Sequence, residues 1–342
     1  MNTWRFLPDV GGLEAAADLI AGGLCELDHT VTVTTRTVGA HGANRHKPYR
    51  VVERPGAGEF LRLLRRSDIF VHNNISGYAA WPLMFVPRPW VVSHHVLFPK
   101  RGEPGGRRAQ VKGFLLRYAN NISVSEAISR TLRVPSVVIE NPYDDRVFKV
   151  LPFVERSHDV IFIGRLVPDK GVDVMLRALA ILASQGKRPV TTIVGDGSAR
   201  AELEAITTRF GLSGNVTFVG TKTGGALAEL LNQHKIMVVP STCEEAFGIV
   251  ALEGIACGCM VVAARSGGLP EAVGPCGKIF PKNDHAALAE DLALLLGRPQ
   301  LMASYRVQAG EHLRRHSTRA VAERYLKVFR RVLSDRVEKA EL

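Results

Sequence analysis

Short apolar runs alternate with longer stretches of helical periodicity along almost the whole chain. Val31–Thr35, Trp90–Ser93 and Asp159–Gly164 are runs of this kind, rich in Val and Ile. The stretches between runs, such as Leu13–Leu27 and Glu59–Arg66, repeat apolar residues every three or four positions, as amphipathic helices do. Strands that are apolar without a break are typical of a parallel sheet covered by helices on both faces. The pattern therefore predicts an α/β fold.

The alternation is interrupted once, near the middle of the chain. A turn cluster at Asn141–Asp145 is followed by a polar stretch, and the strand and helix signals restart at Asp159. We therefore predict two doubly wound, Rossmann-like domains, with residues 1–150 in the first and 151–317 in the second. In such sheets the ligand binds outside the carboxyl ends of the strands, so the two domains are expected to face a central cleft.

The last part of the chain, residues 318–342, carries one apolar stripe. Its spacing of i, i+4, i+7, i+8 and i+11 is that of one face of a helix, and the other face is basic. The stripe consists of Val321, Tyr325, Val328, Phe329 and Val332. We expect this helix to cross back to the first domain.

The composition is that of a globular protein with large cores. The chain has 342 residues, of which 46% are hydrophobic. No run reaches the ~18 apolar residues that a membrane-spanning helix needs. The start MNTWRFLPDVGG has the features of neither a signal peptide nor a transit peptide. The five cysteines lack the spacing of a disulfide framework or a metal site, and we expect them to be reduced in a cytoplasmic protein.

The net charge of +11 is concentrated in the first half of the chain. The first 150 residues hold 20 Lys and Arg against 13 Asp and Glu, with basic clusters at Arg62–Arg66 and Lys100–Lys112. A basic face serves anionic lipids, nucleic acids or phosphorylated substrates, or is simply a solvated surface. Because no stacking-aromatic or groove-reading motif accompanies it, we expect no nucleic acid partner. We expect the first domain to dock on an anionic membrane surface, which would make the protein peripheral at the inner face of the cell membrane.

The stretch Pro240–Val273 has the most informative pattern in the chain. It follows a buried strand, Lys235–Pro240, and carries Glu245 and Glu253 eight positions apart. Eight positions are just over two helical turns, so both carboxylates are expected near one face at the start of a helix. A helix N-terminus attracts phosphate, and carboxylates accept hydrogen bonds from sugar hydroxyls. The alternative is a surface helix with two exposed glutamates.

A second segment, Gly164–Gly171, has the chemistry to hold a diphosphate. Arg165 and Lys170 stand five positions apart between a predicted strand and a predicted helix. Two cations and the amide dipoles of a helix N-terminus would bind a diphosphate and help it to leave. The spacing of a P-loop is absent. Solvated loop cations are the alternative.

Two segments of the first half contain further candidates. Gly11 and Gly12 precede a helix and would let the backbone approach a ligand closely, or form only a tight turn. His94 and His95 follow a predicted strand, where a histidine can hydrogen-bond a substrate or polarise a hydroxyl. A structural role for these histidines stays open.

Other motifs of catalysis and cofactor binding are absent or incomplete. Gly195-Asp196-Gly197 resembles half of a dinucleotide fingerprint, but Arg200 stands where the third glycine would be. The sequence has no Asp-x-Asp, no His/Cys cluster with zinc spacing and no GxSxG elbow. We therefore predict that Arg, Lys and helix dipoles handle phosphate, without a metal or a cofactor.

These motifs resemble those of a known family, the GT-B fold, retaining, nucleotide-sugar-dependent glycosyltransferases of family 4 (glycosyl transferases group 1). FIGRLVPDKGVDVMLRALA is similar to the family's strand–GR–x4–KG–helix segment, and IVGDG to its next strand and turn. PSTCEEAFGIVALEGIACGCMVVAARSGGLPEAV is similar to its E-x7-E block with a Gly-Gly-x-Pro-Glu tail. PDVGGLE, VVSHHV, ISVSEAIS and VVIENPYDDRVF show weaker likeness in the first domain. The resemblance covers nearly the whole chain.

The resemblance implies a role for each matching residue. Arg165 and Lys170 would hold the donor diphosphate. Glu253 would accept hydrogen bonds from the ribose hydroxyls, and Glu245 from hydroxyls of the donor sugar. His95 would lie near the donor sugar and the acceptor. The other substrate-binding positions would be Gly11, Gly12, His94, Gly164, Gly195, Phe247, Gly248, Ile249 and Val250.

The implied activity is metal-independent transfer of a hexose from a UDP- or GDP-linked sugar, with retention of configuration. The acceptor would be a hydroxyl of a glycan, a lipid-linked or a small molecule, as in polysaccharide biosynthesis. In this family the leaving phosphate assists the incoming acceptor, which fits a site without a pair of catalytic carboxylates. Two other functions stay open: a nucleotide-sugar epimerase, and a catalytically impaired nucleotide-sugar-binding protein.

The sequence departs from the family's pattern in three places. Only Met1–Phe6 precede the glycine loop, where the family has a longer apolar strand. We therefore expect either an upstream start or a damaged edge of the first sheet, which would impair activity. Pro142 and Ala246 replace two glycines, and Met260 stands where the family commonly has Pro. These last changes are expected to be tolerated.

Overall fold

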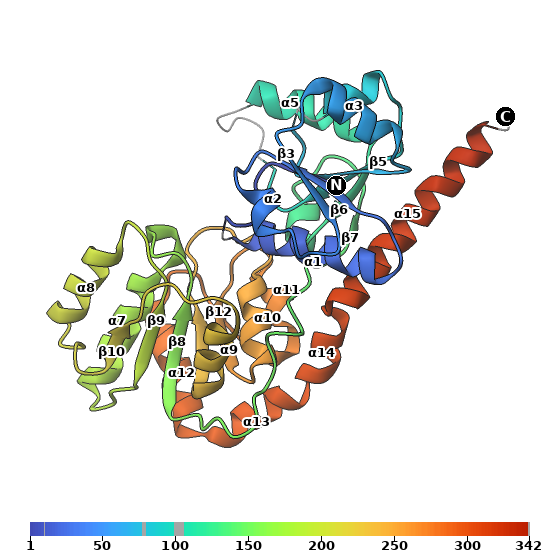
Figure 1. Cartoon of the computed structure of the whole chain (residues 1–342). Helices are drawn as coiled ribbons and strands as arrows, with labels where there is room; N and C mark the ends of the chain where they lie inside the picture. Colours follow the sequence, from blue (N-terminus) through green and yellow to red (C-terminus); the bar gives the residue numbers. More distant parts are fainter. Residues whose placement is uncertain (10, 77–79, 99–105, 341–342) are drawn as a thin grey trace. The chain divides into compact units, whose positions relative to one another are not determined.

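The structure, a computed structural model, divides the chain into two units (Figure 1). It describes residues 1–9, 11–76, 80–98 and 106–340. The first unit contains Met1–Pro142 and the chain from His316 onward, and the second contains Tyr143–Arg315.

The first boundary lies before the predicted one because the segment after Pro142 is fastened to the second unit. The backbone N–H of Leu151 donates to Oδ1 of Asn232 at 2.8 Å, and Nδ2 of Asn232 donates to the carbonyl of Lys149 at 3.0 Å. Asn232 is almost fully buried. The segment before residue 151 therefore packs as part of the second unit.

A seven-stranded parallel sheet forms the centre of the first unit, in the order β3-β2-β1-β4-β5-β6-β7. Its strands are β1 (Asn2–Thr3), β2 (Thr32–Thr35), β3 (Arg50–Glu53), β4 (Phe70–Asn73), β5 (Trp90–His94), β6 (Asn120–Ser123) and β7 (Ser136–Val138). The two-residue strand β1 is short, as expected, but it lies in the middle of the sheet, where Asn2 pairs with Thr34 and with His72. The predicted damaged edge is therefore wrong.

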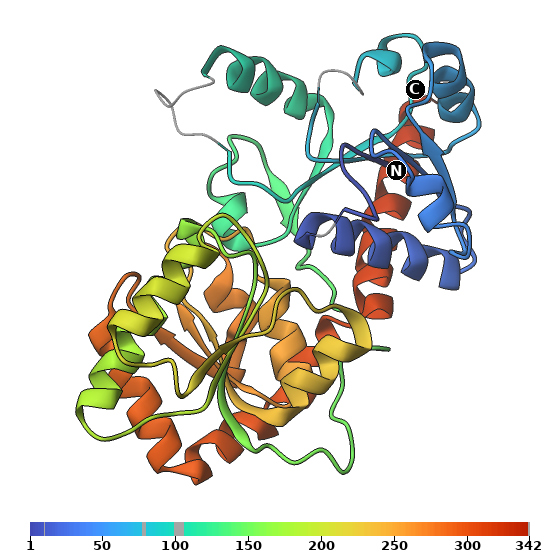
Figure 2. The same ribbon diagram turned by 60° about the vertical axis from the view of Figure 1, so that its left-hand side comes forward.

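Helices cover the first sheet, and two of them, α1 and α15, lie side by side although they are far apart in sequence (Figures 1 and 2). The helices are α1 (Gly12–Glu26), α2 (Ala40–Ala43), α3 (Ala57–Arg65), η1 (Trp81–Met84), α5 (Gly106–Leu115), η2 (Leu116–Tyr118), α6 (Glu126–Ser129) and α15 (Thr318–Ala340). A Cβ on Gly23 would lie 3.0 Å from Cβ of Ala322, so glycine permits this close approach. The apolar stripe of α15 packs against α1 and against Val71, Val91 and Ile122 of the sheet.

A six-stranded parallel sheet forms the centre of the second unit, in the order β10-β9-β8-β11-β12-β13. Its strands are β8 (His158–Ile163), β9 (Thr191–Val194), β10 (Val216–Phe218), β11 (His234–Val239), β12 (Met260–Ala264) and β13 (Gly277–Phe280). Strand β8 pairs with β9 on one side and with β11 on the other, so the strand order reverses between β8 and β11. In doubly wound sheets such a switch point is where ligands bind.

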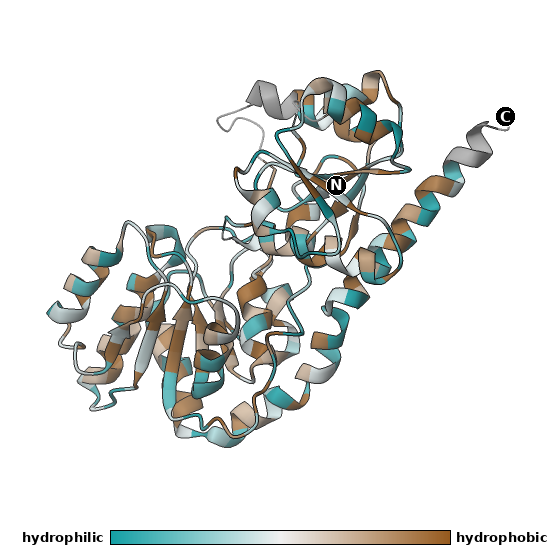
Figure 3. Ribbon diagram, viewed as in Figure 1, coloured by the Kyte–Doolittle hydropathy of each residue, from teal (hydrophilic) through white to brown (hydrophobic). Residues whose placement is uncertain are grey.

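The strands of the second unit form an apolar centre between two layers of helices, which Figure 3 shows as brown strands beneath mixed helices. The helices are η3 (Pro168–Lys170), α7 (Val172–Ser184), α8 (Arg200–Arg209), α9 (Gly224–Gln233), α10 (Ile249–Ala256), α11 (Leu269–Val273), η4 (Gly274–Cys276), α12 (His285–Gly297), α13 (Pro299–Val307) and α14 (Ala309–Arg315). Both units are thus doubly wound, as the apolar pattern predicts.

Two expectations from composition concern membrane-spanning helices and the basic cluster at 100–112, and the described residues can be compared with both. No described helix is long and apolar enough to cross a membrane. Of the predicted basic cluster at 100–112, Lys100 and Arg101 lie outside the described residues, as do the side chains of Arg107 and Arg108. Lys112 is half-buried on α5.

Candidate functional site

The loops that follow β8 and β11 meet at the switch point of the second sheet. Gly171, which ends the first loop, has a φ of +67°, and a Cβ there would lie 2.0 Å from the carbonyl oxygen of Pro240. The backbone N–H of Thr242 donates to the carbonyl of Asp169 at 2.9 Å. The left-handed conformation and the lack of a side chain at Gly171 therefore let the two loops touch through their backbones.

One charged pair joins these loops. Nζ of Lys170 lies 2.5 Å from Oε1 of Glu245, and Oγ of Ser241 donates to the same oxygen at 2.6 Å. The side chains of Lys170 and Glu245 are 22% and 17% exposed, so the pair is partly shielded from water. An ion pair of this kind is stronger than a fully exposed one. The structure thus brings together two of the predicted site residues.

The glycine pair after β12 fixes the backbone of Glu245. Gly268 donates its N–H to the carbonyl of Glu245 at 2.8 Å. Gly267 has a φ of +50°, and a Cβ there would lie 2.0 Å from the same carbonyl oxygen. Its N–H donates to Oε2 of the neighbouring Glu244 at 2.7 Å. The pair therefore allows a third loop to close against the Glu245 loop.

Glu245 does not lie on a helix, which corrects the prediction for the E-x7-E block. Helix α10 begins only at Ile249, because Gly248 adopts a φ of +109° and ends the loop. A Cβ on Gly248 would lie 2.4 Å from Cδ2 of Leu269. Glu253 is on the second turn of α10, and the described residues show no contact between the two carboxylates. The spacing of eight therefore reflects a loop residue followed by a helical residue.

Two of the predicted substrate-binding residues are part of the core. The side chains of Phe247 and Ile249 are buried. A ligand can therefore reach them only through their backbone, whereas Val250 at the first turn of α10 is partly exposed.

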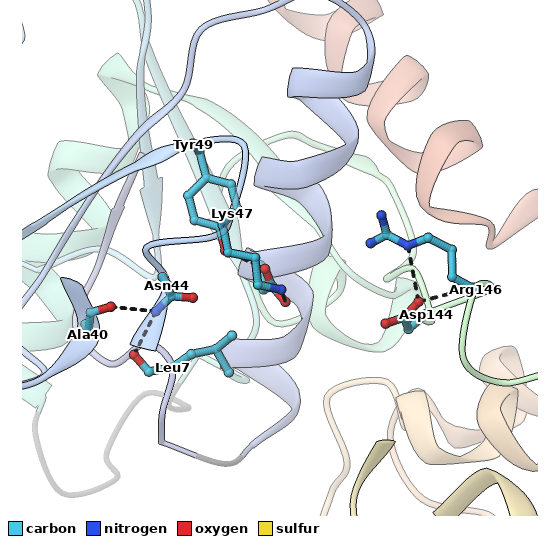
Figure 4. A network of polar contacts seen from close by, with 8 residues as sticks. Leu7, Ala40, Asn44, Lys47, Tyr49, Asp144 and Arg146 are labelled. Atoms are coloured by element: carbon cyan, nitrogen blue, oxygen red, sulfur yellow. Dashed lines mark hydrogen bonds and ion pairs between the residues drawn. The ribbon is translucent and has the colours of Figure 1, made fainter. Parts of the chain in front are cut away.

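Burial raises the pKa of Glu253 to about 7, and the negative charge of Asp144 adds to this effect. Asp144 itself accepts a hydrogen bond from the backbone N–H of Arg146 at 3.2 Å and lies 3.6 Å from its guanidinium (Figure 4). Near neutral pH the Glu253 carboxyl is therefore divided between its neutral and its charged form. A partner that donates hydrogen bonds would favour the carboxylate.

Replacing Glu253 by Gln is expected to change how stability depends on pH. Because the pKa of Glu253 is raised on folding, the stability linked to its protonation is complete below about pH 4.5 and is lost as the pH rises through about 7. The amide does not titrate. Between pH 5 and 8 the free energy of unfolding of the variant should therefore rise relative to that of the wild type, by up to about 3 kcal/mol. Denaturant titrations measure both values. A constant difference over this range, or an equal gain in the surface control Glu202→Gln, would contradict this interpretation.

The loops after β8 and β9 are also in backbone contact. Gly195 has a φ of +137°, and a Cβ there would lie 1.8 Å from the carbonyl oxygen of Gly164. Leu166 donates its N–H to the carbonyl of Asp196 at 2.8 Å. The Arg165 side chain between these contacts is exposed and makes no hydrogen bond or ion pair with any described residue. Its guanidinium is available to an anion.

In the first unit, the loop before α1 is held by a buried amide. Nδ2 of Asn44 donates to the carbonyls of Ala40 at 2.8 Å and Leu7 at 3.3 Å (Figure 4). Gly11 caps α1 in an extended conformation that any residue adopts, so its backbone does not require glycine. A Cβ there would lie 2.3 Å from the Glu14 carboxylate, a side chain that can move. Gly12 is the first residue of α1.

The two histidines of the first unit have different partners. Nε2 of His94 lies 3.0 Å from Oδ1 of Asn121, whose amide nitrogen donates to two backbone carbonyls, so His94 must be the donor in this contact. Nε2 of His95 lies 3.0 Å from Oγ of Ser93, while its buried Nδ1 has no partner among the described residues. Burial lowers the pKa of both histidines, to about 3 for His95, so both are neutral at pH 7.

Several residues that shape the site were missed by the sequence reasoning. Ser241 holds Glu245, and Asp144 acts on the pKa of Glu253. Ser93 contacts His95 and is itself contacted by Tyr325. Only Ser241 had a local signal, as a polar residue just after a buried strand.

The sequence of the second unit matches a known family model. Residues 144–312 match the family described as Glycosyl transferases group 1. The second unit is therefore similar in sequence to the glycosyl transferases group 1. The resemblance seen in the motifs is thereby confirmed.

Comparisons with individual proteins agree with this family. The D-inositol 3-phosphate glycosyltransferase 2 of Catenulispora acidiphila is 37% identical over 187 residues, which are 52% of this chain and 44% of that protein. The match thus spans less than half of the relative's length. The crystal structure of HepE from Anabaena in complex with UDP has a TM-score of 0.81 and 22% identity, over 96% of this chain and 98% of that chain. Sucrose-phosphate synthase from Thermosynechococcus elongatus has a TM-score of 0.80 and 22% identity, over 95% and 94%. The chain has a GT-B fold, as predicted.

Proposed function

We propose that this protein is a retaining glycosyltransferase that moves a hexose from a nucleoside diphosphate sugar to an acceptor hydroxyl. The observation that carries the proposal is the 2.5 Å pair of Lys170 and Glu245 at the switch point of the second sheet. The pair combines a cation for a diphosphate with a carboxylate for sugar hydroxyls. Solved structures of HepE contain UDP and UDP-glucose, which supports a UDP-linked donor ahead of a GDP-linked one.

In this proposal the donor replaces contacts that the residues now make with one another. Phosphate oxygens would take the place of Glu245 beside Lys170, and the freed carboxylate would accept from hydroxyls of the sugar. The unpaired guanidinium of Arg165 would bind the same diphosphate. Glu253 would accept from ribose hydroxyls in its charged form. These cations can neutralise the diphosphate themselves, so we propose that transfer needs no metal.

The reaction exchanges one C–O bond of the sugar for another. The acceptor oxygen bonds to the anomeric carbon on the face that the diphosphate leaves, and the bond from that carbon to the diphosphate oxygen breaks with its electron pair. The acceptor's proton passes to an oxygen of the leaving diphosphate. The contribution of Lys170 and Arg165 is to stabilise the negative charge that develops on the leaving group.

Nuclear magnetic resonance of nucleotide sugars tests this function directly. UDP- and GDP-linked hexoses are incubated with the protein, with and without acceptors that include inositol phosphate, oligosaccharides and a lipid-linked sugar. Transfer predicts nucleotide diphosphate and a glycoside of unchanged anomeric configuration, formed equally in the presence of EDTA. A new nucleotide sugar without acceptor would indicate an epimerase, and donor binding without any product would indicate an impaired binding protein.

We propose in addition that the first unit docks on an anionic membrane, which would place the cytoplasmic protein at the acceptor. Helix α5 and the turn after it expose Val111, Phe114 and Tyr118 at 62%, 55% and 70%. The rings of Phe114 and Tyr118 are in edge contact, with centroids 5.6 Å apart, and Lys112 and Arg117 are the sequence neighbours of Val111 and Tyr118. Exposed apolar side chains with neighbouring cations suit the interface of an anionic bilayer.

Co-sedimentation with vesicles tests the docking proposal. Binding should require anionic lipid, because each cation near the surface contributes about 1 kcal/mol, and it should weaken in high salt. Phe114→Ser is expected to lower the bound fraction several-fold. The control Phe153→Ser changes an exposed phenylalanine of the second unit and should have no effect. Equal sedimentation with neutral vesicles, or equal losses in both variants, would exclude this surface.

A further inference from the structure

Three side chains stand at corresponding positions at the carboxyl end of the first sheet. Trp4, Arg36 and Arg54 are the first residues after β1, β2 and β3, which are neighbouring parallel strands. All three residues are exposed, and Trp4 is 53% exposed although it is a large aromatic residue. Because the carboxyl ends of parallel strands lie at the same edge of a sheet, the three side chains gather where ligands of doubly wound sheets bind.

Backbone contacts fasten the three loops that carry these residues. The N–H of Arg36 donates to the carbonyl of Trp4 at 3.3 Å, and the N–H of Arg54 donates to the carbonyl of Thr35 at 2.7 Å. Nε of Arg54 donates to the carbonyl of Arg36 at 3.1 Å. These bonds hold Arg54 at a φ of +42°, a left-handed conformation that is rare for a residue with a Cβ and is often found at ligand sites. The loops are therefore fixed in one arrangement before a ligand binds, which lowers the cost of binding.

An aromatic ring and two guanidinium groups line a hollow at this edge of the sheet. Its lining includes Trp4, Arg36, Arg54, Thr35 and Phe60. The guanidinium carbon of Arg36 lies 5.2 Å from the centroid of the Trp4 ring. Within the described part of the chain, the Nε bond is the only hydrogen bond of the Arg54 side chain, which forms no ion pair. The N–H groups on the two terminal nitrogens of Arg54 therefore remain for an anion.

The carboxylates that follow the same strands bind other groups. Glu53 accepts hydrogen bonds from the backbone N–H groups of Gly39 and His41. Asp9 accepts a hydrogen bond from the hydroxyl of Thr37 at 3.1 Å. Neither carboxylate forms an ion pair with a described cation. They therefore leave the positive charge of the two arginines for a ligand.

We propose that this edge of the first sheet is a subsite for a phosphorylated sugar or polyol. A phosphate monoester carries about two negative charges and three acceptor oxygens, which suit two guanidinium groups better than the single charge of a carboxylate does. The apolar face of the sugar ring packs on the exposed indole of Trp4. In the transferase proposed above this ligand is the acceptor, and that role rests on the proposed function. Binding at the subsite does not.

The indole signal of Trp4 reports binding without any activity. The chain contains three tryptophans, so proton–nitrogen spectra of the full chain show few indole signals, and Trp4→Phe identifies that of Trp4. Glucose 6-phosphate and inositol phosphate should shift this signal. Glucose and inositol should bind at least about tenfold more weakly, because they lack the charge-assisted hydrogen bonds. Co-sedimentation with phosphatidylinositol vesicles, against phosphatidylserine vesicles of equal charge, tests the same chemistry on a lipid headgroup.

Arg54→Gln is expected to raise the dissociation constant for the phosphorylated ligand at least about tenfold. The matched control is Arg50→Gln, which removes another exposed arginine at the amino end of the same strand and should leave this constant unchanged. If transfer to a phosphorylated acceptor is observed, Arg54→Gln should raise the KM for the acceptor by the same factor and leave the KM for the donor unchanged.

Four results would overturn the proposal. They are equal dissociation constants in the wild type and in folded Arg54→Gln, equal losses in the two arginine variants, equal binding of a sugar and its phosphate, and binding of neither the soluble phosphates nor the phosphatidylinositol vesicles. An equal shift of the Trp4 signal by inorganic phosphate alone would likewise exclude a sugar subsite. Because none of these readouts needs a donor, a failure to detect transfer would count against the proposed function and not against the subsite.

Discussion

Lys170→Ala is expected to lower kcat of sugar transfer about a thousandfold, a loss of about 4 kcal/mol of transition-state stabilisation. The ammonium group lies 2.5 Å from Glu245 at the carboxyl end of the second sheet. In the proposed reaction it meets the diphosphate at the moment when negative charge develops on the leaving oxygen, so its contribution is larger in the transition state than in the bound donor. Steady-state release of nucleotide diphosphate measures the effect, and thermal unfolding shows that the variant is folded.

Lys235→Ala is the matched control for this prediction. Nζ of Lys235 lies 2.8 Å from Oδ1 of Asp159, so it forms another lysine–carboxylate pair between β8 and β11. Both residues are at the amino ends of these strands, at the opposite end of the sheet from Lys170. This variant should keep wild-type kcat. Equal losses in the two variants would mean that the pairs act only through stability.

Gly195→Ala is expected to destabilise the second unit by about 4 kcal/mol or more, a loss of the size caused by severe strain. A Cβ there would lie 1.8 Å from the carbonyl oxygen of Gly164 and 3.0 Å from its carbonyl carbon. Both atoms belong to backbone that continues from a central strand, so neither can move as a flexible side chain would. The φ of +137° adds strain for any residue with a Cβ. Denaturant unfolding measures the loss, and donor binding should weaken with it because Gly164 precedes Arg165.

Gly211→Ala separates the two sources of this strain. Gly211 also has a positive φ, +66°, but a Cβ there would meet nothing within 4 Å. Its replacement should therefore cost only the backbone strain, about 1–3 kcal/mol. Similar losses in both variants would show that the contact between the loops after β8 and β9 is looser than the structure indicates.

Much of this molecule could be predicted from the sequence because its signals are local. Apolar runs separated by helical periodicity specify parallel sheets, and β8 and β11 begin and end within one residue of the predicted strands. Arg165 and Lys170 were found because a strand end and a helix start frame a short loop. Gly164 and Gly195 were named only through the resemblance of their segments to the family's motifs, and the structure adds that backbone contact excludes a Cβ at Gly195.

The rest of the site depends on contacts between distant parts of the chain. The spacing of Glu245 and Glu253 suggested one helical face, but Gly248 delays the helix, which the periodicity of the segment did not show. The shift in the pKa of Glu253 depends on burial and on Asp144, far away in sequence. The bond between Ser93 and Tyr325 spans 232 positions and has no local signal. Contacts of this kind form only when the chain folds, so no local pattern in the sequence identifies these residues.

The most direct test of the donor site is thermal unfolding of the wild type and of Glu253→Gln with UDP and UDP-sugars in the absence of metal. A ligand at ~100 times its dissociation constant should stabilise the wild type by roughly 2.7 kcal/mol. We expect this shift for the wild type and for Lys235→Ala, and we expect it to be lost in Glu253→Gln. A shift of equal size in Glu253→Gln, at the same ligand concentration, would contradict the assignment of the donor to the carboxyl end of the second sheet.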